Sequence, residues 1–213
     1  AEGCDKHCTY CIIPKLRGKF RSVPMERLVT QAKEMAEEGV KELILVAQET
    51  TVYGTDIYGK KSLHILLKEL CKIKGIRWIR VLYCYPEEIY DELIQTMKEE
   101  KKICHYLDLP IQHARDRILK RLGRRTTQAE LVEIVNKLRR EIPDIVLRTT
   151  LISGFPGETQ EDHEELMGFV DEMEFDRLGV FTYSPEEDTP AATMPDQVAE
   201  EVKEARRDEI MEL

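Results

Sequence analysis

Three of the six cysteines lie within eight residues of one another, at Cys4, Cys8 and Cys11 in the segment GCDKHCTYC. Thiols at this density are typical of metal ligands, because thiolates bind both zinc and iron–sulfur clusters. Disulfides are a weaker interpretation, since three is an odd number and neighbouring thiols in one loop rarely reach bridging geometry. With His7 as a fourth ligand the loop could hold zinc, and with one iron left open it could hold an iron–sulfur cluster. The spacing alone leaves both alternatives open.

The composition indicates a globular protein with a substantial core. The chain has 213 residues, of which 42% are hydrophobic and 34% charged, enough for one large domain or two small ones. No apolar run is long enough to cross a bilayer and no signal-peptide pattern precedes the cysteines, so we expect no membrane association. Cys71, Cys84 and Cys104 lie in apolar surroundings, which indicates reduced core thiols and a cytoplasmic protein.

The net charge bears on the kind of partner. The formal net charge is −9, which argues against strong binding of a nucleic-acid backbone by this chain alone. An acidic surface suits a basic protein partner, through long-range electrostatic steering. The alternative is that the charge only keeps the chain in solution.

Helical and strand patterns alternate along the chain. Apolar residues recur with helical spacing in five segments, at 22–39, 63–75, 86–100, 126–143 and 159–174. Short apolar segments typical of strands alternate with them, at 40–47, 76–83, 105–110, 145–153 and 176–184. Thr127 and Glu130 form a capping-box pattern, and Thr159 is the expected cap of the next helix.

This alternation predicts parallel βα units whose strands are covered on both faces. About six units fall short of the eight that close a barrel, so we expect an α/β fold with a partial, open TIM-type barrel. Five strands lie within the chain. The strand of the first βα unit is expected just upstream of residue 1, which would make this chain a fragment. Residues 1–184 form the predicted barrel. Residues 185–213 form a loop and an amphipathic helix that caps the barrel or leads to an absent domain.

Polar residues or a glycine-containing loop follow four of the predicted strands. They are Gln48 with Glu49, Gln112 with His113, the segment GFPGET at 154–159, and Tyr183. Taken singly, each has a structural alternative as a helix cap or a turn. Because the loops after parallel strands gather at one barrel face, we expect these residues to meet the cysteine loop in one cavity.

At this point the sequence resembles a known family. The segment from Cys4 to Cys11 resembles the C-x3-C-x2-C signature of radical S-adenosylmethionine (SAM) enzymes. Together with QETTVYG, DLPIQHARDRILKRLGR, RTTLISGFPGET and FTYSPEEDTPAATMPDQV, it is similar to the methylthiotransferases over essentially the whole chain. The resemblance implies a [4Fe–4S] cluster held by Cys4, Cys8 and Cys11, with one iron open to SAM and His7 facing solvent.

The resemblance also implies a reaction and a set of cofactor contacts. An electron from the reduced cluster cleaves SAM, and the resulting 5′-deoxyadenosyl radical takes hydrogen from an unactivated carbon. The implied SAM contacts are Tyr10 and the backbone near Gly154 and Tyr183 at the adenine, Gln48 and Glu49 at the methionine end, and Gln112 and Arg148 at the ribose or carboxylate. The alternative for Arg148 is an ion pair with Glu49.

Within the methylthiotransferases, the chain most resembles enzymes that modify an aspartate of protein twelve of the small ribosomal subunit. The implied partners are that protein or the ribosome and a reductant such as flavodoxin or ferredoxin, and we expect a monomer. The family also carries an N-terminal domain with a second [4Fe–4S] cluster and a C-terminal substrate-binding domain, neither present in these residues. One alternative is a tRNA adenosine methylthiotransferase, disfavoured by QHAR at 112–115 and PDQV at 195–198. Another is a non-catalytic zinc-binding module.

Overall fold

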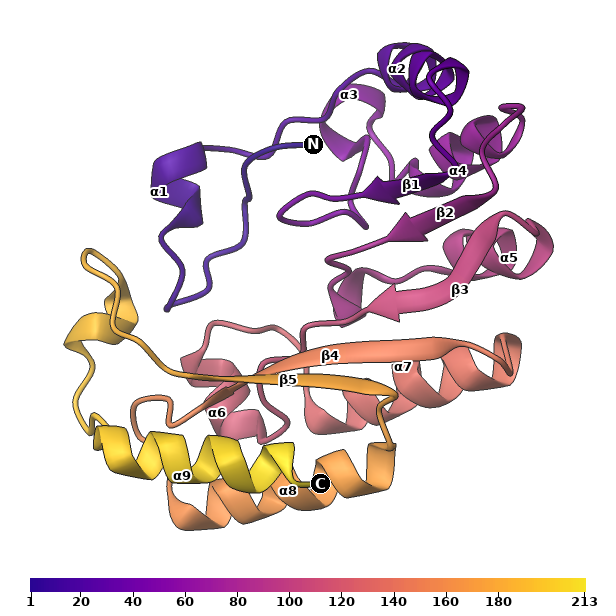
Figure 1. Cartoon of the computed structure of the whole chain (residues 1–213). Helices are drawn as coiled ribbons and strands as arrows, with labels where there is room; N and C mark the ends of the chain where they lie inside the picture. Colours follow the sequence, from indigo (N-terminus) through magenta and orange to yellow (C-terminus); the bar gives the residue numbers. More distant parts are fainter.

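The computed structural model describes all residues, 1–213, and contains one open sheet of five parallel strands (Figure 1). The strands pair in chain order: β1 Glu42–Leu45, β2 Trp78–Val81, β3 Ile103–Asp108, β4 Val146–Ser153 and β5 Arg177–Thr182. Each overlaps one of the five predicted strand segments, which confirms the strand count and the parallel, open architecture. Spatial order that follows chain order is what a barrel built from successive βα units requires.

Five long helices lie in the five segments with helical spacing, and a sixth is the amphipathic helix predicted within residues 185–213. They are α2 Met25–Glu37, α4 Leu63–Cys71, α5 Asp91–Glu99, α7 Gln128–Glu141, α8 Gln160–Met173 and α9 Glu200–Met211. Four shorter elements lie in segments that the sequence left as loops: α1 Ile13–Arg17, α3 Thr55–Tyr58, α6 Asp116–Arg121 and the 3-10 turn η2 Pro190–Thr193. The segment predicted as one helix at 86–100 begins instead with a separate 3-10 turn, η1 Pro86–Glu88. Elements of fewer than two turns show no periodicity, so their sequence carries little signal. A membrane span would need a longer and more apolar helix than any in this fold.

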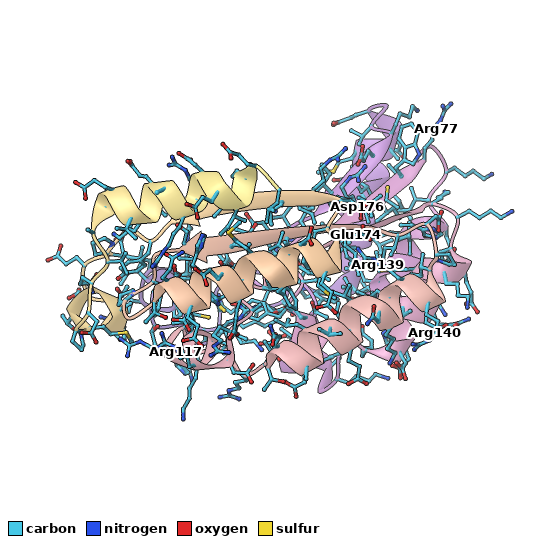
Figure 2. All side chains as sticks on the ribbon, turned by 90° about the horizontal axis from the view of Figure 1, so that it is seen from below. Arg77, Arg117, Arg139, Arg140, Glu174 and Asp176 are labelled. Carbon is cyan, nitrogen blue, oxygen red and sulfur yellow. The ribbon has the colours of Figure 1, made fainter.

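Capping boxes fix where two of the long helices begin. The hydroxyl of Thr127 accepts a hydrogen bond from the Glu130 amide, and the Glu130 carboxylate accepts one from the Thr127 amide, as predicted. Thr159 and Asp162 make the same pair of bonds at the start of α8. Arg117 also donates to the Asp162 carboxylate. Figure 2 shows Arg117 at one end of the layer formed by α7, α8 and α9.

The helices cover only one face of the sheet. In Figure 2, α7, α8 and α9 lie beneath the strands in a single layer. Along β4, Leu147 and Leu151 are buried under this layer, whereas Arg148 and Ile152 point to the other face and are half-buried. The expectation that strands are covered on both faces is therefore wrong for the inner face, because the curved sheet does not close.

The carboxyl ends of the strands form the edge that positions the site. In Figure 1 this edge faces left, toward the loop that precedes α1 and toward the segment that follows β5. Helix α9 returns along β4 and β5 beside α8. Its Lys203 is buried, and the ammonium group donates to the carbonyl of Tyr183, 2.9 Å away. Ser153 donates to the Lys203 carbonyl at 2.6 Å, so α9 is tied to the ends of both strands.

Candidate active site

The cysteine loop is anchored to the end of α6. The Thr9 amide donates to the carbonyl of Leu122 at 3.0 Å, and the Cys11 amide closes a turn by donating to the carbonyl of Cys8 at 3.1 Å. Gly123 allows the close approach: its φ is +77°, and a Cβ there would lie 2.7 Å from the His7 carbonyl oxygen. The three cysteines are therefore held in a defined loop.

Hydrogen-bonding groups reach the sulfurs of two of the three loop cysteines. Cys4 and Cys8 are buried and Cys11 is half-buried, and none is in a disulfide. The Lys6 amide donates to the sulfur of Cys4 at 3.4 Å, and the hydroxyl of Tyr85 lies 3.4 Å from the sulfur of Cys8. Burial raises the pKa of the Cys4 thiol, and the Lys6 amide opposes that shift. Hydrogen-bond donors at the sulfur are what a metal-bound thiolate needs.

Zinc and iron place different demands on this loop. No three cysteine, histidine, aspartate or glutamate side chains converge as ligands of a single metal ion, and His7 is exposed. A [4Fe–4S] cluster binds each thiolate through a different iron, so it accepts thiols spread over a wider loop. The donor set of Cys4, Cys8 and Cys11 fits a cluster better than it fits a tetrahedral zinc ion.

A cavity of about 390 Å³ opens beside the loop, and we call it the cysteine cavity. Its lining includes Cys4, Cys8, Glu49, Tyr85 and Arg124. Glu49 follows β1 and is 1% exposed. One carboxylate oxygen accepts the Thr51 amide at 2.9 Å, and the other has no partner. Burial raises the pKa of Glu49 to about 7, which leaves a polar group poised to receive a ligand.

A second cavity of about 420 Å³, the sheet cavity, lies on the inner face of the strands. Its lining includes five of the residues predicted to contact SAM: Tyr10, Gln48, Gln112, Arg148 and Tyr183. Tyr85 is the one residue that lines both cavities. Counting Glu49, six of the seven predicted contact residues therefore line one of two adjoining cavities beside the cysteine loop. The expectation of a single cavity is wrong, and Cys11 and His113 line neither one.

Two polar atoms of the sheet cavity are buried without partners. They are the side-chain carbonyl oxygen of Gln48 and the hydroxyl oxygen of Tyr183. Gln112 has a φ of +70°, and two backbone bonds hold it there, from its amide to Thr150 and from the Ile152 amide to its carbonyl. A non-glycine residue in this conformation is strained, and such strain gathers at ligand sites.

Arg148 pairs with a different carboxylate from the one expected. Its guanidinium donates to Asp108 at 2.6 Å and to the hydroxyl of Thr150 at 3.2 Å. The alternative of an ion pair with Glu49 is wrong, because Asp108 sits beside Arg148 in the register of β3 and β4. The rest of the guanidinium lies on the inner face, where Arg148 lines the sheet cavity.

Gly154 is the predicted contact residue that the structure places elsewhere. It lines neither cavity, and its amide donates to the buried carboxylate of Glu158. A Cβ at this position would lie 2.2 Å from Cγ of Lys203, so α9 packs directly against this glycine. The loop supports Tyr183 instead, because the ring of Phe155 packs edge-on against that of Tyr183, with the ring centroids 5.2 Å apart.

The structure adds three residues that the sequence did not single out. Tyr85, Arg124 and Asp108 line the cavities or orient a residue that does. Tyr85 follows β2, the one strand after which the sequence analysis named no candidate residue. The rule that functional residues follow the strands could have identified Tyr85. Arg124 comes after α6, a short helix that the periodicity did not predict.

Comparisons with known proteins place this geometry in a family. Residues 1–170 match the radical SAM superfamily, and the chain belongs to that superfamily. It is similar to the ribosomal protein uS12 methylthiotransferase RimO of Lachnoclostridium phytofermentans, with 70% identity over 213 residues, which are all of this chain and 48% of that protein. The RimO of Clostridium perfringens strain 13 is 63% identical over 211 residues, 99% of this chain and 47% of that protein. The chain spans about half the length of these relatives.

Solved structures of more distant enzymes share the fold. Coproporphyrinogen III oxidase (HemN) of Escherichia coli, a radical SAM enzyme, is 19% identical with a TM-score of 0.71, over all of this chain and 50% of that one. The radical SAM methyltransferase TsrM of Kitasatospora setae is 17% identical with a TM-score of 0.72, over 89% of this chain and 37% of that one. At these identities the likeness concerns the fold, a partial barrel of the radical SAM type.

Proposed function

We propose that this chain is the radical-generating part of an enzyme that adds a methylthio group to the β-carbon of an aspartate in ribosomal protein uS12. The observation that carries the proposal is the 63–70% identity, over essentially the whole chain, to proteins named for that activity. The cysteine loop beside two cavities supports it, since the reaction needs a cluster and SAM in adjoining spaces.

In this proposal Cys4, Cys8 and Cys11 hold the [4Fe–4S] cluster. Bound together, the cluster and SAM supply a one-electron cleavage of the sulfonium whose product removes hydrogen from an unactivated carbon. The chain itself binds and orients. The unpartnered oxygens of Glu49 and Gln48 are available to accept hydrogen bonds from N–H groups at the methionine end of SAM.

The sheet cavity holds the nucleoside end of SAM. Tyr10 and Tyr183 offer ring faces to the adenine, and the hydroxyl of Tyr183 is free to bind a ring nitrogen. Gln112 and Arg148 lie where the ribose or the carboxylate would reach them. Gly154 is left out of this set. Its loop supports Tyr183 through Phe155 instead.

Methylthio transfer also needs parts outside these residues. We place a second [4Fe–4S] cluster and the substrate-binding domain in further regions of the whole protein, because Cys71 in α4, Cys84 after β2 and Cys104 in β3 do not converge as a ligand set. We propose uS12 or the ribosome as the protein partner, flavodoxin or ferredoxin as reductant, a monomeric enzyme, and the cytoplasm as its compartment.

Two measurements test this proposal. Anaerobic reconstitution of the chain should give about four irons and four sulfides per chain, and tight zinc binding that depends on His7 would contradict the cluster. The full-length enzyme should then be offered uS12 and tRNA side by side. Mass spectrometry is expected to find methylthio-aspartate in uS12 and no methylthio-adenosine, and the opposite result would overturn the substrate.

A further inference from the structure

Tyr85 occupies a position that the proposed SAM contacts do not explain. It lines both cavities, is 9% exposed, and places its hydroxyl 3.4 Å from the sulfur of Cys8. The contact is buried, so water does not compete for it. Between a phenol and a sulfur only one hydrogen bond is possible here, and its direction depends on which atom carries the proton.

The ring of Tyr85 lies between two cations. The guanidinium carbon of Arg124 is 4.0 Å from the ring centroid, and the ammonium of Lys6 is 5.0 Å from it. Positive charge at the ring draws electron density from the hydroxyl and strengthens it as a hydrogen-bond donor. Lys6 also forms an ion pair with Glu88, which compensates its charge. Arg124 is therefore the less compensated of the two cations.

Arg124 is a buried cation with unused donors. It is 6% exposed, and one nitrogen donates to the Pro110 carbonyl at 2.8 Å. Two further nitrogens, Nε and Nη1, are buried without partners, and Glu87 comes no closer than 4.0 Å. A buried charge without close compensation is costly, which indicates that negative charge enters this space when the site is filled.

The remaining acidic groups of the cysteine cavity leave that positive charge uncompensated. Glu88 is held by Lys6 and Lys61, and burial raises the pKa of Glu49 so that it is partly neutral near pH 7. A phenol carries its proton near neutral pH, so the hydroxyl of Tyr85 has a proton to donate. A metal-bound thiolate has no proton to give. The donor in the contact is therefore Tyr85.

We infer that Tyr85, with Arg124 stacked on its ring, donates a hydrogen bond to the Cys8 thiolate and thereby raises the reduction potential of the cluster. The inference rests on the proposed cluster at Cys4, Cys8 and Cys11. Hydrogen bonds to the sulfurs and nearby positive charge favour the reduced form, which carries one more negative charge. The electron comes from an external one-electron donor. Tyr85 and Arg124 act through a ligand and are positioning residues.

The test compares two tyrosines that both have a cation at the ring. Tyr85→Phe removes one oxygen, whereas Tyr106→Phe removes the hydroxyl from a ring that Arg80 covers at 5.0 Å. The reconstituted chains are titrated with dithionite against redox mediators and followed by EPR. For Tyr85→Phe we expect about a tenfold smaller ratio of reduced to oxidised cluster at a fixed potential, a shift of about 59 mV to more negative values. Tyr106→Phe should match the unaltered chain.

A second pair isolates the charge. Arg124→Met should shift the potential in the same direction, while Arg140→Met removes an exposed arginine that Figure 2 shows at the opposite end of the helix layer from Arg117. Should Arg124→Met not fold, Tyr85→Phe decides alone. A Tyr85→Phe cluster with unshifted potential overturns the inference. Iron and sulfide are counted first, because failure of the unaltered chain to load four irons contradicts the proposed function instead.

Discussion

Glu49 and Glu158 are both buried carboxylates near the carboxyl edge of the sheet, yet their surroundings are opposite. Glu49, after β1, accepts one bond from the Thr51 amide, and its second oxygen has no partner. Burial therefore dominates and raises its pKa to about 7. The group faces the cysteine cavity with part of its bonding capacity unused.

Glu158, after β4, is surrounded by donors. The amides of Gly154 and Phe155 and the guanidinium of Arg206 bind its oxygens, and His113 lies 3.6 Å away. Burial alone would raise its pKa, but the nearby His113 and these donors outweigh burial and hold the pKa of Glu158 below its ordinary value.

The difference separates a binding region from a supporting one. Around the cysteine loop, buried oxygens and nitrogens are left open, as expected where a ligand completes the bonding. Between β4, α8 and α9 the buried carboxylates are fully engaged by donors, although Nδ1 of His163 and Nε of Arg206 have no partner. These bonds fix the loops that the first region depends on. Substitutions should therefore affect the cofactors in the first region and folding stability in the second.

The largest expected effect is loss of the cluster in Cys8→Ala. Removing one of three thiolates should reduce iron per reconstituted chain from about four to near zero. The matched variant is Cys104→Ala, which removes a free, half-buried thiol of β3 and should keep the full iron content. Equal iron in the two variants, counted by colorimetric assay, would break the distinction between loop and sheet cysteines.

Next is the stability of Glu158→Gln. Losing this carboxylate leaves the Arg206 cation buried without its partner, and breaking a buried pair costs about 3–5 kcal/mol. Urea unfolding at pH 8 should show that loss in the free energy of unfolding. Glu49→Gln should be as stable as the unaltered chain or more so, because its charge is buried without compensation. A Glu158→Gln variant as stable as Glu49→Gln would show that the two carboxylates do not differ in their contribution to folding stability.

The pH dependence of stability should trace to Glu49. The unfolded chain releases this proton near the ordinary pKa of 4.5 and the folded chain near 7, so between these values the folded state binds more protons. Stability should then fall as pH rises through this window, by on the order of 3 kcal/mol for this group. Urea unfolding of the cluster-free chain at several pH values measures it. Glu49→Gln should lack this component, and an unchanged slope would contradict the assignment.

A smaller effect concerns two glycines. Gly154→Ala would place a methyl group against Lys203 at a φ of +69°, and we expect a loss of about 2 kcal/mol in the free energy of unfolding. Gly168 lies in α8 with open space where its Cβ would be, so Gly168→Ala should gain about 0.5–1 kcal/mol. Thermal melting compares the pair, and a neutral Gly154→Ala would show that α9 is packed less tightly against the loop.

The sequence predicted the long elements because their periodicity reflects burial on one face. The strands overlap the predicted segments, the six long helices lie within predicted helical regions, and the capping box at Thr127 is present. The elements it left as loops, such as α6, are too short to show a period. The open inner face does have a sequence signal that the prediction did not use, because Arg148 and Thr150 alternate with buried residues, as expected of a strand covered on one face only.

The sequence predicted those residues of the candidate site that directly follow a strand. Residues after β1, β3 and β5 line the cavities beside the cysteine loop, as parallel topology requires. Gly154 does not, because its place is decided by α9, some fifty residues further along the chain. Arg124 and its contact with Tyr85 depend on the path of the chain after α6, which no local pattern determines.

The central claim is that the open polar groups beside the cysteine loop bind SAM for radical cleavage. The reconstituted chain, reduced with dithionite, should convert SAM to 5′-deoxyadenosine, which chromatography quantifies. Glu49→Gln loses a charged hydrogen bond, so the SAM concentration for half-maximal rate should rise about tenfold or more with the cluster intact. Absence of 5′-deoxyadenosine from a chain loaded with four irons, or equal SAM dependence in Glu49→Gln, would contradict the account.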